Sequence, residues 1–207
     1  MIKAVLFDMD GVLIDAKDWH YEALNRALDL FGLAIDRDAH LSSFDGLPTR
    51  KKLEILSASR GLSKKLHAFI NDMKQSYTAE IAYARCRPVF QHGFALSRLK
   101  TAGYRLAVCS NSVRASVNLM MSLSQLDRYL DLQLSNEDVS KPKPDPEIYT
   151  TAIRRFGLEP SECLVVEDND HGIQAARASG AHVLVVATTG DVTYSAIMQA
   201  IDNAEGR

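Results

Sequence analysis

Residues 5–13 read Val5-Leu6-Phe7-Asp8-Met9-Asp10-Gly11-Val12-Leu13. An apolar run that ends in two carboxylates and a glycine is typical of a buried parallel strand whose carboxyl end leaves the sheet. In open α/β sheets, ligands bind at these strand ends. Because side chains alternate along a strand, we expect Asp8 and Asp10 to point the same way if the extended conformation persists. Two close carboxylates repel each other unless a cation neutralises them or one is protonated, although solvated turn aspartates are the simpler alternative.

The composition is that of an ordinary globular enzyme or binding protein. The 207 residues are 46% hydrophobic and 24% charged, which allows one core of ordinary size and a smaller unit. A net charge of −2 with scattered Lys and Arg argues against a nucleic-acid partner. No signal-length apolar segment precedes Asp8, and no run of about 18 apolar residues follows. We therefore expect a cytoplasmic protein with no membrane partner.

The cysteines predict no metal site and no disulfide framework. Cys86, Cys109 and Cys163 are odd in number and lack the spacing of metal ligands. Cys109 and Cys163 each lie in an apolar run, so we expect buried thiols in a reducing compartment.

Residues 15–85 contain no convincing strand and show helical spacing throughout. Apolar residues recur every three or four positions, and glycines end the first two segments. A helical block of this length between two strands indicates an insertion. We predict a helical domain at 15–85 within a core made of 1–14 and 86–207. Its predicted helices are 15–32, 49–60 and 63–85, with a polar, turn-rich passage at 40–48.

From Pro88 onward, helical and extended segments alternate. Strands separated by helices of this length predict a parallel sheet with helices on both faces. The fold class is therefore α/β, with a doubly wound, Rossmann-like core and an inserted helical cap. The predicted strands are 104–109, 132–134, 163–166 and 182–187, and the predicted helices are 94–102, 114–126, 145–157 and 171–179.

Polar side chains follow several of the predicted strands at their carboxyl ends. Because these ends converge on one edge of a parallel sheet, we expect the side chains to lie together. An excess of carboxylates predicts Mg²⁺ with oxygen ligands, and a lysine and a hydroxyl beside it would hold phosphate oxygens. An aspartate facing a polarised phosphoryl group can attack it. The side chains are Asp8 and Asp10, Ser110 and Asn111, Glu167 and Asp168, and, in a loop, Lys141.

Four segments resemble, in order and spacing, the motifs of the haloacid dehalogenase superfamily in its phosphatase and phosphomutase branch. The resemblance spans essentially the whole chain and is greatest to the β-phosphoglucomutase-like subgroup, whose members include sugar-phosphate phosphatases. It implies a helical cap between the first two motifs. The segments are 7–13 (Phe-Asp-Met-Asp-Gly-Val-Leu), 109–112 (Cys-Ser-Asn-Ser), 140–149 (Ser-Lys-Pro-Lys-Pro-Asp-Pro-Glu-Ile-Tyr) and 166–169 (Val-Glu-Asp-Asn) with Gly172.

The resemblance implies a role for each matching residue. Asp8 would be the nucleophile, and Asp10 would protonate the leaving alcohol and then activate water. Ser110 and Lys141 would hold the transferring phosphoryl group. The implied Mg²⁺ ligands are Asp8, Asp168 and the backbone carbonyl of Asp10, with Glu167 binding the ion directly or through another ligand.

Substrate-binding residues are expected at Asn111 and in the helical domain. His20 resembles a cap-hinge histidine of the subgroup, and an ordinary surface histidine is the alternative. Residues 44–52 resemble the substrate-specificity loop of the family, which makes Gly46 and Arg50 candidates. A basic residue at a helix start opposes the helix dipole, which suggests an anionic group on the substrate.

We therefore predict a Mg²⁺-dependent phosphomonoester hydrolase, a monomer or weak homodimer, that acts on a small phosphorylated metabolite such as a sugar or polyol phosphate. The nearest rival is a phosphosugar mutase, whose members place an arginine where this chain has Thr49, one residue before Arg50. A phospho-accepting signalling domain is a rival of another class, although it needs neither the Asp-x-Asp spacing nor the helical insertion. A dehalogenase is disfavoured, because that branch lacks an acid at the position of Asp10 and needs no metal.

Overall fold

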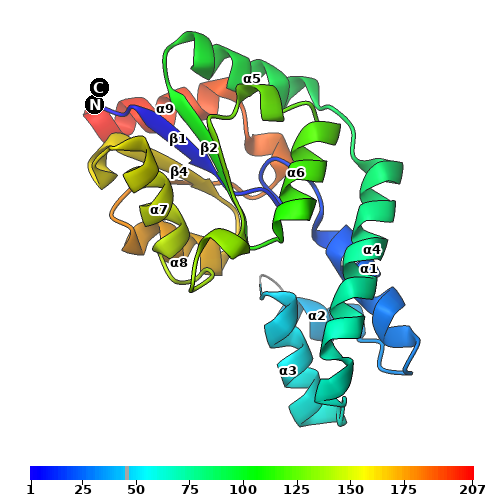
Figure 1. Cartoon of the computed structure of the whole chain (residues 1–207). Coiled ribbons are helices and arrows are strands. Elements are labelled where there is room, and N and C mark those ends of the chain that lie inside the picture. The colour runs from blue at the N-terminus through cyan, green and yellow to red at the C-terminus, as the bar shows by residue number, and fades with distance from the viewer. Residues whose placement is uncertain (45–46) are drawn as a thin grey trace. The chain divides into compact units, whose positions relative to one another are not determined.

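The computed structural model describes residues 1–44 and 47–207. For residues 41–43 it describes the backbone alone. The chain divides into two compact units (Figure 1). The first, here called the α/β unit, comprises Met1–Asp15 and Cys86–Arg207, and the second, the helical unit, comprises Ala16–Arg85. Each unit is described by itself.

The α/β unit is built on a five-stranded parallel sheet with the order β3-β2-β1-β4-β5. The first strand along the chain lies at the centre, and the chain winds outward from it in both directions, which confirms the predicted doubly wound α/β fold. Phe7 at the end of β1 pairs with Val108 on one side and Val166 on the other. The carboxyl ends of β1, β2 and β4 therefore meet at one edge. The strands are β1 (Ala4–Phe7), β2 (Arg105–Cys109), β3 (Leu132–Leu134), β4 (Cys163–Glu167) and β5 (His182–Val185).

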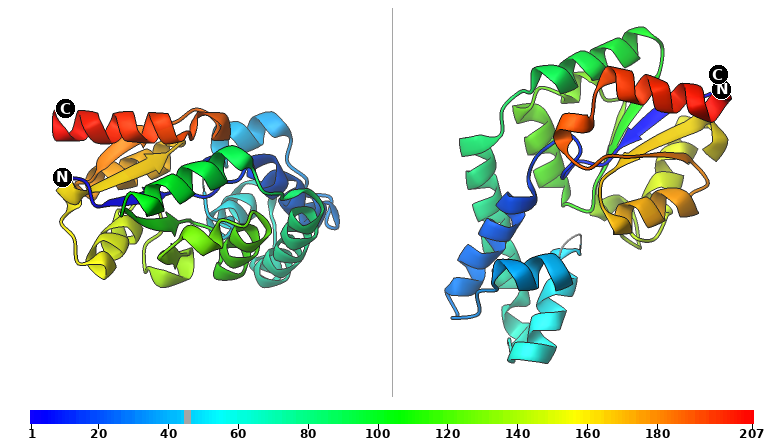
Figure 2. Two further views of the ribbon diagram at one scale, coloured as in Figure 1. Left: turned by 90° about the horizontal axis from the view of Figure 1, so that it is seen from above. Right: turned by 180° about the vertical axis from the view of Figure 1, so that it is seen from behind.

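Helices cover both faces of the sheet, so its central strand is buried along its whole length. The face to which Ala4 and Leu6 point packs against α7 and α8. Val5 and Phe7 alternate with them and point to the opposite face, where α5 and α9 lie side by side (Figure 2). The helices of this unit are α5 (Phe90–Thr101), α6 (Arg114–Leu123), α7 (Glu147–Phe156), α8 (Asp170–Ala178) and α9 (Tyr194–Glu205).

Spacing along α7 explains its position on the sheet. Ile148, Ala152 and Phe156 recur every four residues and are buried, as are Tyr149 and Ile153 beside them. This is the apolar stripe of an amphipathic helix packed on a core. One buried member of the stripe, Tyr149, carries a hydroxyl that must find a partner.

The helical unit has its own core, in which α1 packs along α4 (Figure 1). Its helices are α1 (Lys17–Asp29), α2 (Arg37–Ser43), α3 (Thr49–Arg60) and α4 (His67–Arg85). Its buried apolar cluster comprises Leu24, Ala27, Leu28, Ile35, Phe44, Leu53, Leu56, Leu62 and Ile70.

Several element boundaries differ from those that the sequence predicts. The passage at 40–48 was expected to be a turn, but α2 occupies its first part because Asp36 caps the helix by accepting from the Ala39 N–H at 2.7 Å. The chain after residue 187 also carries a helix, α9, for which the periodicity gave no expectation. Five short 3₁₀ segments complete the described elements: Lys64–Leu66, Asp127–Tyr129, Asn136–Asp138, Pro160–Glu162 and Thr189–Asp191.

Two further expectations can be compared with the structure. Cys86, Cys109 and Cys163 are free and buried, as predicted. Burial raises the pKa of the Cys109 thiol to about 12, which makes it unreactive. No helix in the described part of the chain has the length and apolar character that crossing a bilayer requires.

Candidate active site

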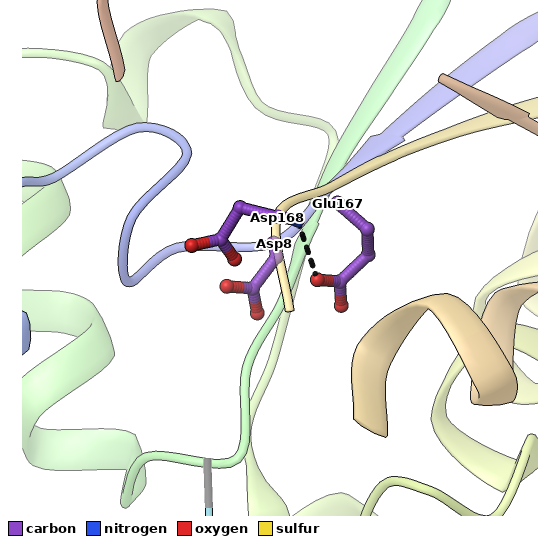
Figure 3. A group of neighbouring side chains, drawn as sticks. All are labelled: Asp8, Glu167 and Asp168. Atoms are coloured by element: carbon purple, nitrogen blue, oxygen red, sulfur yellow. Dashed lines mark hydrogen bonds between the residues drawn. The ribbon is translucent and has the colours of Figure 1, made fainter. Parts of the chain in front are cut away.

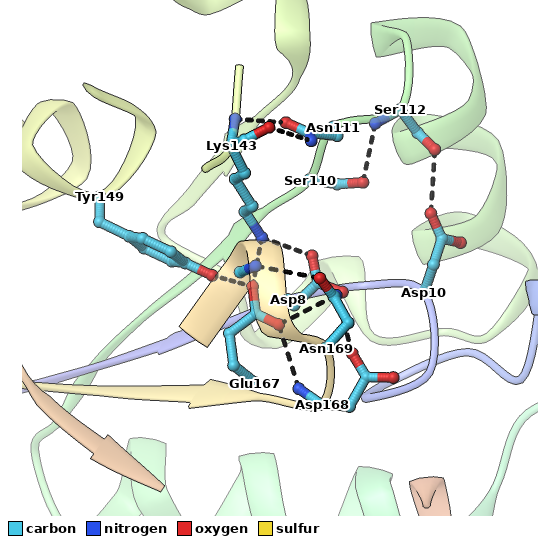
Figure 4. A network of polar contacts seen from close by, with 11 residues as sticks. Asp8, Asp10, Ser110, Asn111, Ser112, Lys143, Tyr149, Glu167, Asp168 and Asn169 are labelled. Carbon is cyan, nitrogen blue, oxygen red and sulfur yellow. Dashed lines mark hydrogen bonds and ion pairs between the residues drawn. The ribbon is translucent and has the colours of Figure 1, made fainter. Parts of the chain in front are cut away.

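The chain turns sharply after β1 and separates the two aspartates that follow it. The strand ends at Phe7, and the Met9 carbonyl then accepts from the N–H groups of Leu13 (3.0 Å) and Ile14 (2.9 Å). Gly11 takes a φ of +96°, which few other residues adopt. Extended conformation therefore does not persist to Asp10, and the two carboxylates differ in partner and direction (Figure 4).

Three carboxylates meet where β1 and β4 end. Asp8, Glu167 and Asp168 each offer an oxygen, and these oxygens lie within 4.8 Å of one another (Figure 3). Asp8 is 5% exposed and Glu167 is fully buried. The parallel register explains the grouping, because Phe7 pairs with Val166 and the next residue of each strand is acidic.

A buried lysine lies between two of these carboxylates, and it is Lys143. Its ammonium donates to Asp8 Oδ1 at 2.6 Å and to Glu167 Oε1 at 2.7 Å. Lys141, the lysine expected here from the sequence, has a side chain that is 75% exposed and whose ammonium lies 3.9 Å from the Asp145 carboxylate. The lysine of the site is therefore Lys143 and not Lys141, the residue that the sequence predicted.

Two anchors in the loop that precedes α7 explain why Lys143 is the lysine that enters the site. The Asn111 side chain accepts from the Lys143 N–H at 3.0 Å and donates to its carbonyl at 3.2 Å. Glu147 accepts from the N–H groups of Ser140 (2.9 Å) and Lys141 (2.8 Å). The Asn111 amide, expected to bind substrate, is used to hold the backbone of Lys143.

Glu167 is surrounded by donors on both oxygens. Oε1 accepts from Lys143 and from the Tyr149 hydroxyl at 2.6 Å. Oε2 accepts from the Asp168 N–H at 3.0 Å and the Asn169 side chain at 3.3 Å (Figure 4). Glu167 thereby fixes the ammonium of Lys143 and the start of the segment that carries Asp168.

The first turn of α8 packs directly against this carboxylate. Asn169 caps the helix, because its Oδ1 accepts from the Gly172 N–H at 3.0 Å. A Cβ atom at Gly172 would lie only 1.9 Å from Glu167 Oε1, so no larger residue fits without moving Glu167. The absence of a side chain at Gly172 therefore leaves the space that the Glu167 carboxylate occupies.

Ser110 follows β2 and is almost completely buried, at 1% exposed. Its Oγ accepts from the Ser112 N–H at 3.0 Å, which leaves the Ser110 O–H proton to donate elsewhere. The helix that follows, α6, begins after Val113, and no side chain in the described part of the chain caps it. Ser112 in turn donates its hydroxyl to Asp10 Oδ2 at 2.9 Å.

The electrostatics of the site are dominated by burial and by like charges. Burial raises the pKa of Asp8 well above its usual range, the Lys143 ammonium opposes this rise, and Glu167 and Asp10 add to it. Burial by itself lowers the pKa of Lys143, but Asp8 and Glu167 outweigh it and raise that pKa. Lys143 is therefore a permanent cation, yet it does not balance the acidic groups around it.

The donor set fits a hard divalent cation. Asp8, Glu167 and Asp168 face one ammonium, so carboxyl groups outnumber cations among the described side chains of the site. Mg²⁺ prefers carboxylate and carbonyl oxygens and is usually held by one or two carboxylates. Asp8 and Asp168 are the available ligands, because both oxygens of Glu167 already accept hydrogen bonds.

Two of the three substrate-binding residues predicted in the helical unit lie in the described part of the chain, and their surroundings differ. His20 lies on α1 and is half-buried, with Nδ1 3.2 Å from Nζ of Lys74. The Arg50 side chain is 85% exposed and pairs with Glu54 at 3.1 Å. Gly46 lies outside the described residues. The expected roles of these residues at the substrate stay predictions.

Four residues that shape the site lie in or beside the motif segments, but the sequence assigned no role to them: Ser112, Lys143, Tyr149 and Gly172. Lys141 and Lys143 both precede a proline, so the local sequence does not separate them. Tyr149 belongs to the apolar stripe of α7, and its periodicity indicates only a core position. A signal existed for Ser112, since it follows β2 by three residues.

Comparison with known proteins finds similar sequences over most of the chain. Residues 5–186 match the family described as Haloacid dehalogenase-like hydrolase. The Phosphorylated carbohydrates phosphatase of Thermotoga maritima is 29% identical over 182 residues, which cover 86% of this chain and 82% of the relative. Pyrophosphatase PpaX of Bacillus velezensis is 30% identical over 206 residues, covering 94% of this chain and 88% of the relative.

Solved structures show the same fold. The β-phosphoglucomutase of Clostridium difficile superposes with a TM-score of 0.85 and covers 100% of both chains. The two sequences are 21% identical, so this likeness concerns the fold alone.

Proposed function

The chain belongs to the haloacid dehalogenase-like hydrolase family and is a phosphatase of that family, and we propose that it hydrolyses a small phosphorylated metabolite through an aspartyl-phosphate intermediate. The observation that carries the proposal is the contact between Asp8 and the buried ammonium of Lys143 at the end of the central strand. A sugar or polyol phosphate is the expected substrate, in keeping with the name of the Thermotoga maritima relative.

In the first half of the reaction, a carboxylate oxygen of Asp8 attacks phosphorus and forms a new P–O bond. The bond from phosphorus to the ester oxygen breaks, and protonated Asp10 gives its proton to the departing alcohol. Lys143 and the Ser110 hydroxyl bind the non-bridging oxygens of the transferring group. Their donors are in place beforehand, because each is held by other residues.

In the second half, water attacks the phosphorus of the aspartyl phosphate. Asp10, now a carboxylate, takes a proton from that water as the P–O bond to Asp8 breaks. Inorganic phosphate leaves, and both aspartates return to their starting state. Asp8 and Asp10 can hold these separate roles because the turn after β1 directs them to different partners.

Mg²⁺ would be held by Asp8, Asp168 and the backbone carbonyl of Asp10, and when bound it would neutralise charge on the phosphoryl oxygens. Glu167 supports this site from behind: it holds Lys143 with one oxygen and the Asp168 N–H with the other. We expect the helical unit, with His20 and Arg50, to select the alcohol part of the substrate.

The test is a screen of phosphorylated metabolites with purified wild-type protein and Asp8→Asn. We expect wild type to release inorganic phosphate in the presence of Mg²⁺ and to lose that activity with EDTA. Asp8→Asn should show a loss of at least about 10⁴-fold, because no covalent intermediate can form. Circular dichroism of the variant checks that it remains folded.

Product analysis separates the proposal from its rivals. Isomerised sugar phosphate without release of free phosphate would identify a mutase. A stable phosphoprotein without turnover would identify a signalling domain. Full activity of Asp8→Asn would rule out the covalent route.

A further inference from the structure

Ser112 lies between Asp10, which would carry the proton of this reaction, and Ser110, which would bind the phosphoryl group. Its hydroxyl donates to Asp10 Oδ2 at 2.9 Å, and its N–H donates to Ser110 Oγ at 3.0 Å (Figure 4). Its carbonyl accepts from the Asn136 N–H at 3.1 Å. All three polar groups of the residue are thus engaged, two of them by candidate active-site residues.

The usual use of a serine near a helix start is not what this residue shows. A capping serine would accept from N–H groups of α6, but the residue at the cap position is Val113, and none of the described side chains caps the helix. Because the hydroxyl donates to a carboxylate, its hydrogen is directed at Asp10. A capping role therefore does not explain Ser112.

The backbone of Asp10 is fixed independently of its side chain. Gly11 N–H donates to the Ile14 carbonyl at 2.7 Å, and the Met9 carbonyl accepts from the N–H groups of Val12, Leu13 and Ile14 within the same turn. An isolated parallel β-bridge pairs the backbones of Asp10 and Ile14. With the backbone held, the direction of the Asp10 carboxyl group depends on its two side-chain torsions. The bond from Ser112 restricts both torsions.

We propose that Ser112 is a positioning residue that aims Asp10 for proton transfer, an inference that rests on the proposed function. Its hydroxyl occupies Oδ2, which makes Oδ1 the oxygen that carries the proton to the leaving alcohol. As the phosphorus–oxygen bond to the alcohol breaks, the proton passes from Asp10 Oδ1 to the alcohol oxygen and Asp10 becomes a carboxylate. The Ser112 bond then stabilises that carboxylate until it accepts the proton of the attacking water.

This role predicts a selective loss that general damage would not produce. A poor leaving group needs the proton, whereas a good leaving group departs without it. Phenyl phosphate and p-nitrophenyl phosphate have nearly the same shape, but p-nitrophenolate is the much better leaving group. The quantity to compare is kcat/KM, because it includes only the steps up to departure of the alcohol.

The experiment measures both substrates with Mg²⁺ for wild type, Ser112→Ala, Ser112→Thr and the control Ser122→Ala, whose serine is exposed on α6. We expect Ser112→Ala to lose about tenfold in kcat/KM for phenyl phosphate and less than about threefold for p-nitrophenyl phosphate, part of the ~10²- to 10⁴-fold that general acids supply. Ser112→Thr keeps the hydroxyl and should recover most of the loss. On an Asp10→Asn background, Ser112→Ala should cause no further selective loss.

Equal losses on the two substrates, or an additional selective loss for phenyl phosphate in the Asp10→Asn background, would overturn the role of Ser112. The same data separate this failure from that of the proposed function. If wild type releases phosphate from neither aryl phosphate and from none of the screened metabolites, or if Asp8→Asn keeps full activity, the proposed function itself is wrong. If both of those controls behave as expected, an unselective Ser112→Ala variant contradicts only the positioning role.

Discussion

The site has two halves that differ in burial and in chemistry. The ionic half comprises Asp8, Lys143, Tyr149 and Glu167, each at most 5% exposed and joined by hydrogen bonds of 2.6–2.7 Å. The hydroxyl half comprises Asp10, Ser110 and Ser112, of which Asp10 and Ser112 are half-buried, with bonds of 2.9–3.0 Å. The ionic half is built around the Lys143 ammonium, and the hydroxyl half holds Asp10, the residue proposed to give and take the proton.

The difference follows from what each half must do. A buried charge is stable only when it is paired and hydrogen-bonded, so the ionic half is closely packed and cannot rearrange cheaply. A group that gives and takes a proton must be stable both with and without it, which favours neutral hydroxyl partners over a cation. We expect variants of the ionic half to affect all substrates alike and variants of the hydroxyl half to discriminate by leaving group.

Among the variants of residues that support Asp8, Lys143→Met should cause the largest loss of activity. It removes the ammonium that faces Asp8 and Glu167, so we expect kcat/KM to fall by at least ~10²-fold, the scale of losing one preorganised donor. The loss should be the same for phenyl and p-nitrophenyl phosphate, because the lysine contacts the group common to both. Steady-state kinetics on the two substrates measures it.

Lys141→Met is the matched control, since it removes a lysine two residues away in the same loop. Its side chain is 75% exposed, and we expect a change in kcat/KM of less than about threefold. A large loss for Lys141→Met together with little loss for Lys143→Met would mean that Lys141, and not Lys143, is the lysine of the ionic half.

Gly172→Ala tests how rigidly the ionic half is held. The new methyl group would meet Glu167 Oε1 at 1.9 Å, and Glu167 can retreat only by losing its bonds to Lys143 or Asp168. We expect a loss of about tenfold in kcat/KM and of about 1–3 kcal/mol in the free energy of unfolding, as for overpacked cores. Urea unfolding and kinetics together measure the two effects.

Gly93→Ala provides the control for this substitution. Gly93 also lies in a helix, α5, but apart from its chain neighbours and the adjacent helix backbone no atom of the described residues lies within 4 Å of the place that a methyl group would take there. We expect unchanged kinetics and a gain of about 0.5–1 kcal/mol, because alanine favours the helix. If Gly172→Ala behaved like Gly93→Ala, the close packing of Gly172 against Glu167 would not be what holds that carboxylate in place.

Glu147→Gln should have the smallest effect, a decrease in the free energy of unfolding that depends on pH. The hydrogen bond from the Ser140 N–H, followed by that from Lys141, lowers the pKa of Glu147 in the folded protein. A carboxyl group with a lowered folded pKa stabilises the fold above its unfolded pKa of about 4.3, and this contribution disappears as the pH falls through the folded pKa. Wild type should therefore be more stable than Glu147→Gln at pH 7.

The comparison of wild type and Glu147→Gln by urea unfolding at pH 7 and near pH 3 checks the sign. The gap between their unfolding free energies should shrink in acid. A gap that is equal at both pH values would mean that the charge of Glu147 does not hold the loop before Lys143.

Much of this architecture could be predicted, and the reasons are local. The buried run at Ala4–Phe7 and the alternation after Pro88 indicated a parallel sheet, and the register of β1 and β4 then placed Asp8 beside Glu167 and Asp168. Helix α2 escaped prediction because its short segment, capped by Asp36, is mostly polar. Lys143 escaped because the choice between two lysines depends on where Asn111 anchors the loop.

Periodicity and motif spacing along the chain were enough to establish the order of the strands and of most helices, the acidic groups at the strand ends and the family. Which lysine enters the site, why Gly172 must be small, and what Ser112 and Tyr149 contact became known only from the folded chain. Those outcomes depend on distances between segments that are far apart in the sequence: 135 residues separate Asp8 from Lys143. No local preference encodes such a contact, since it forms only when the sheet brings the ends of β1 and β4 beside the loop before α7.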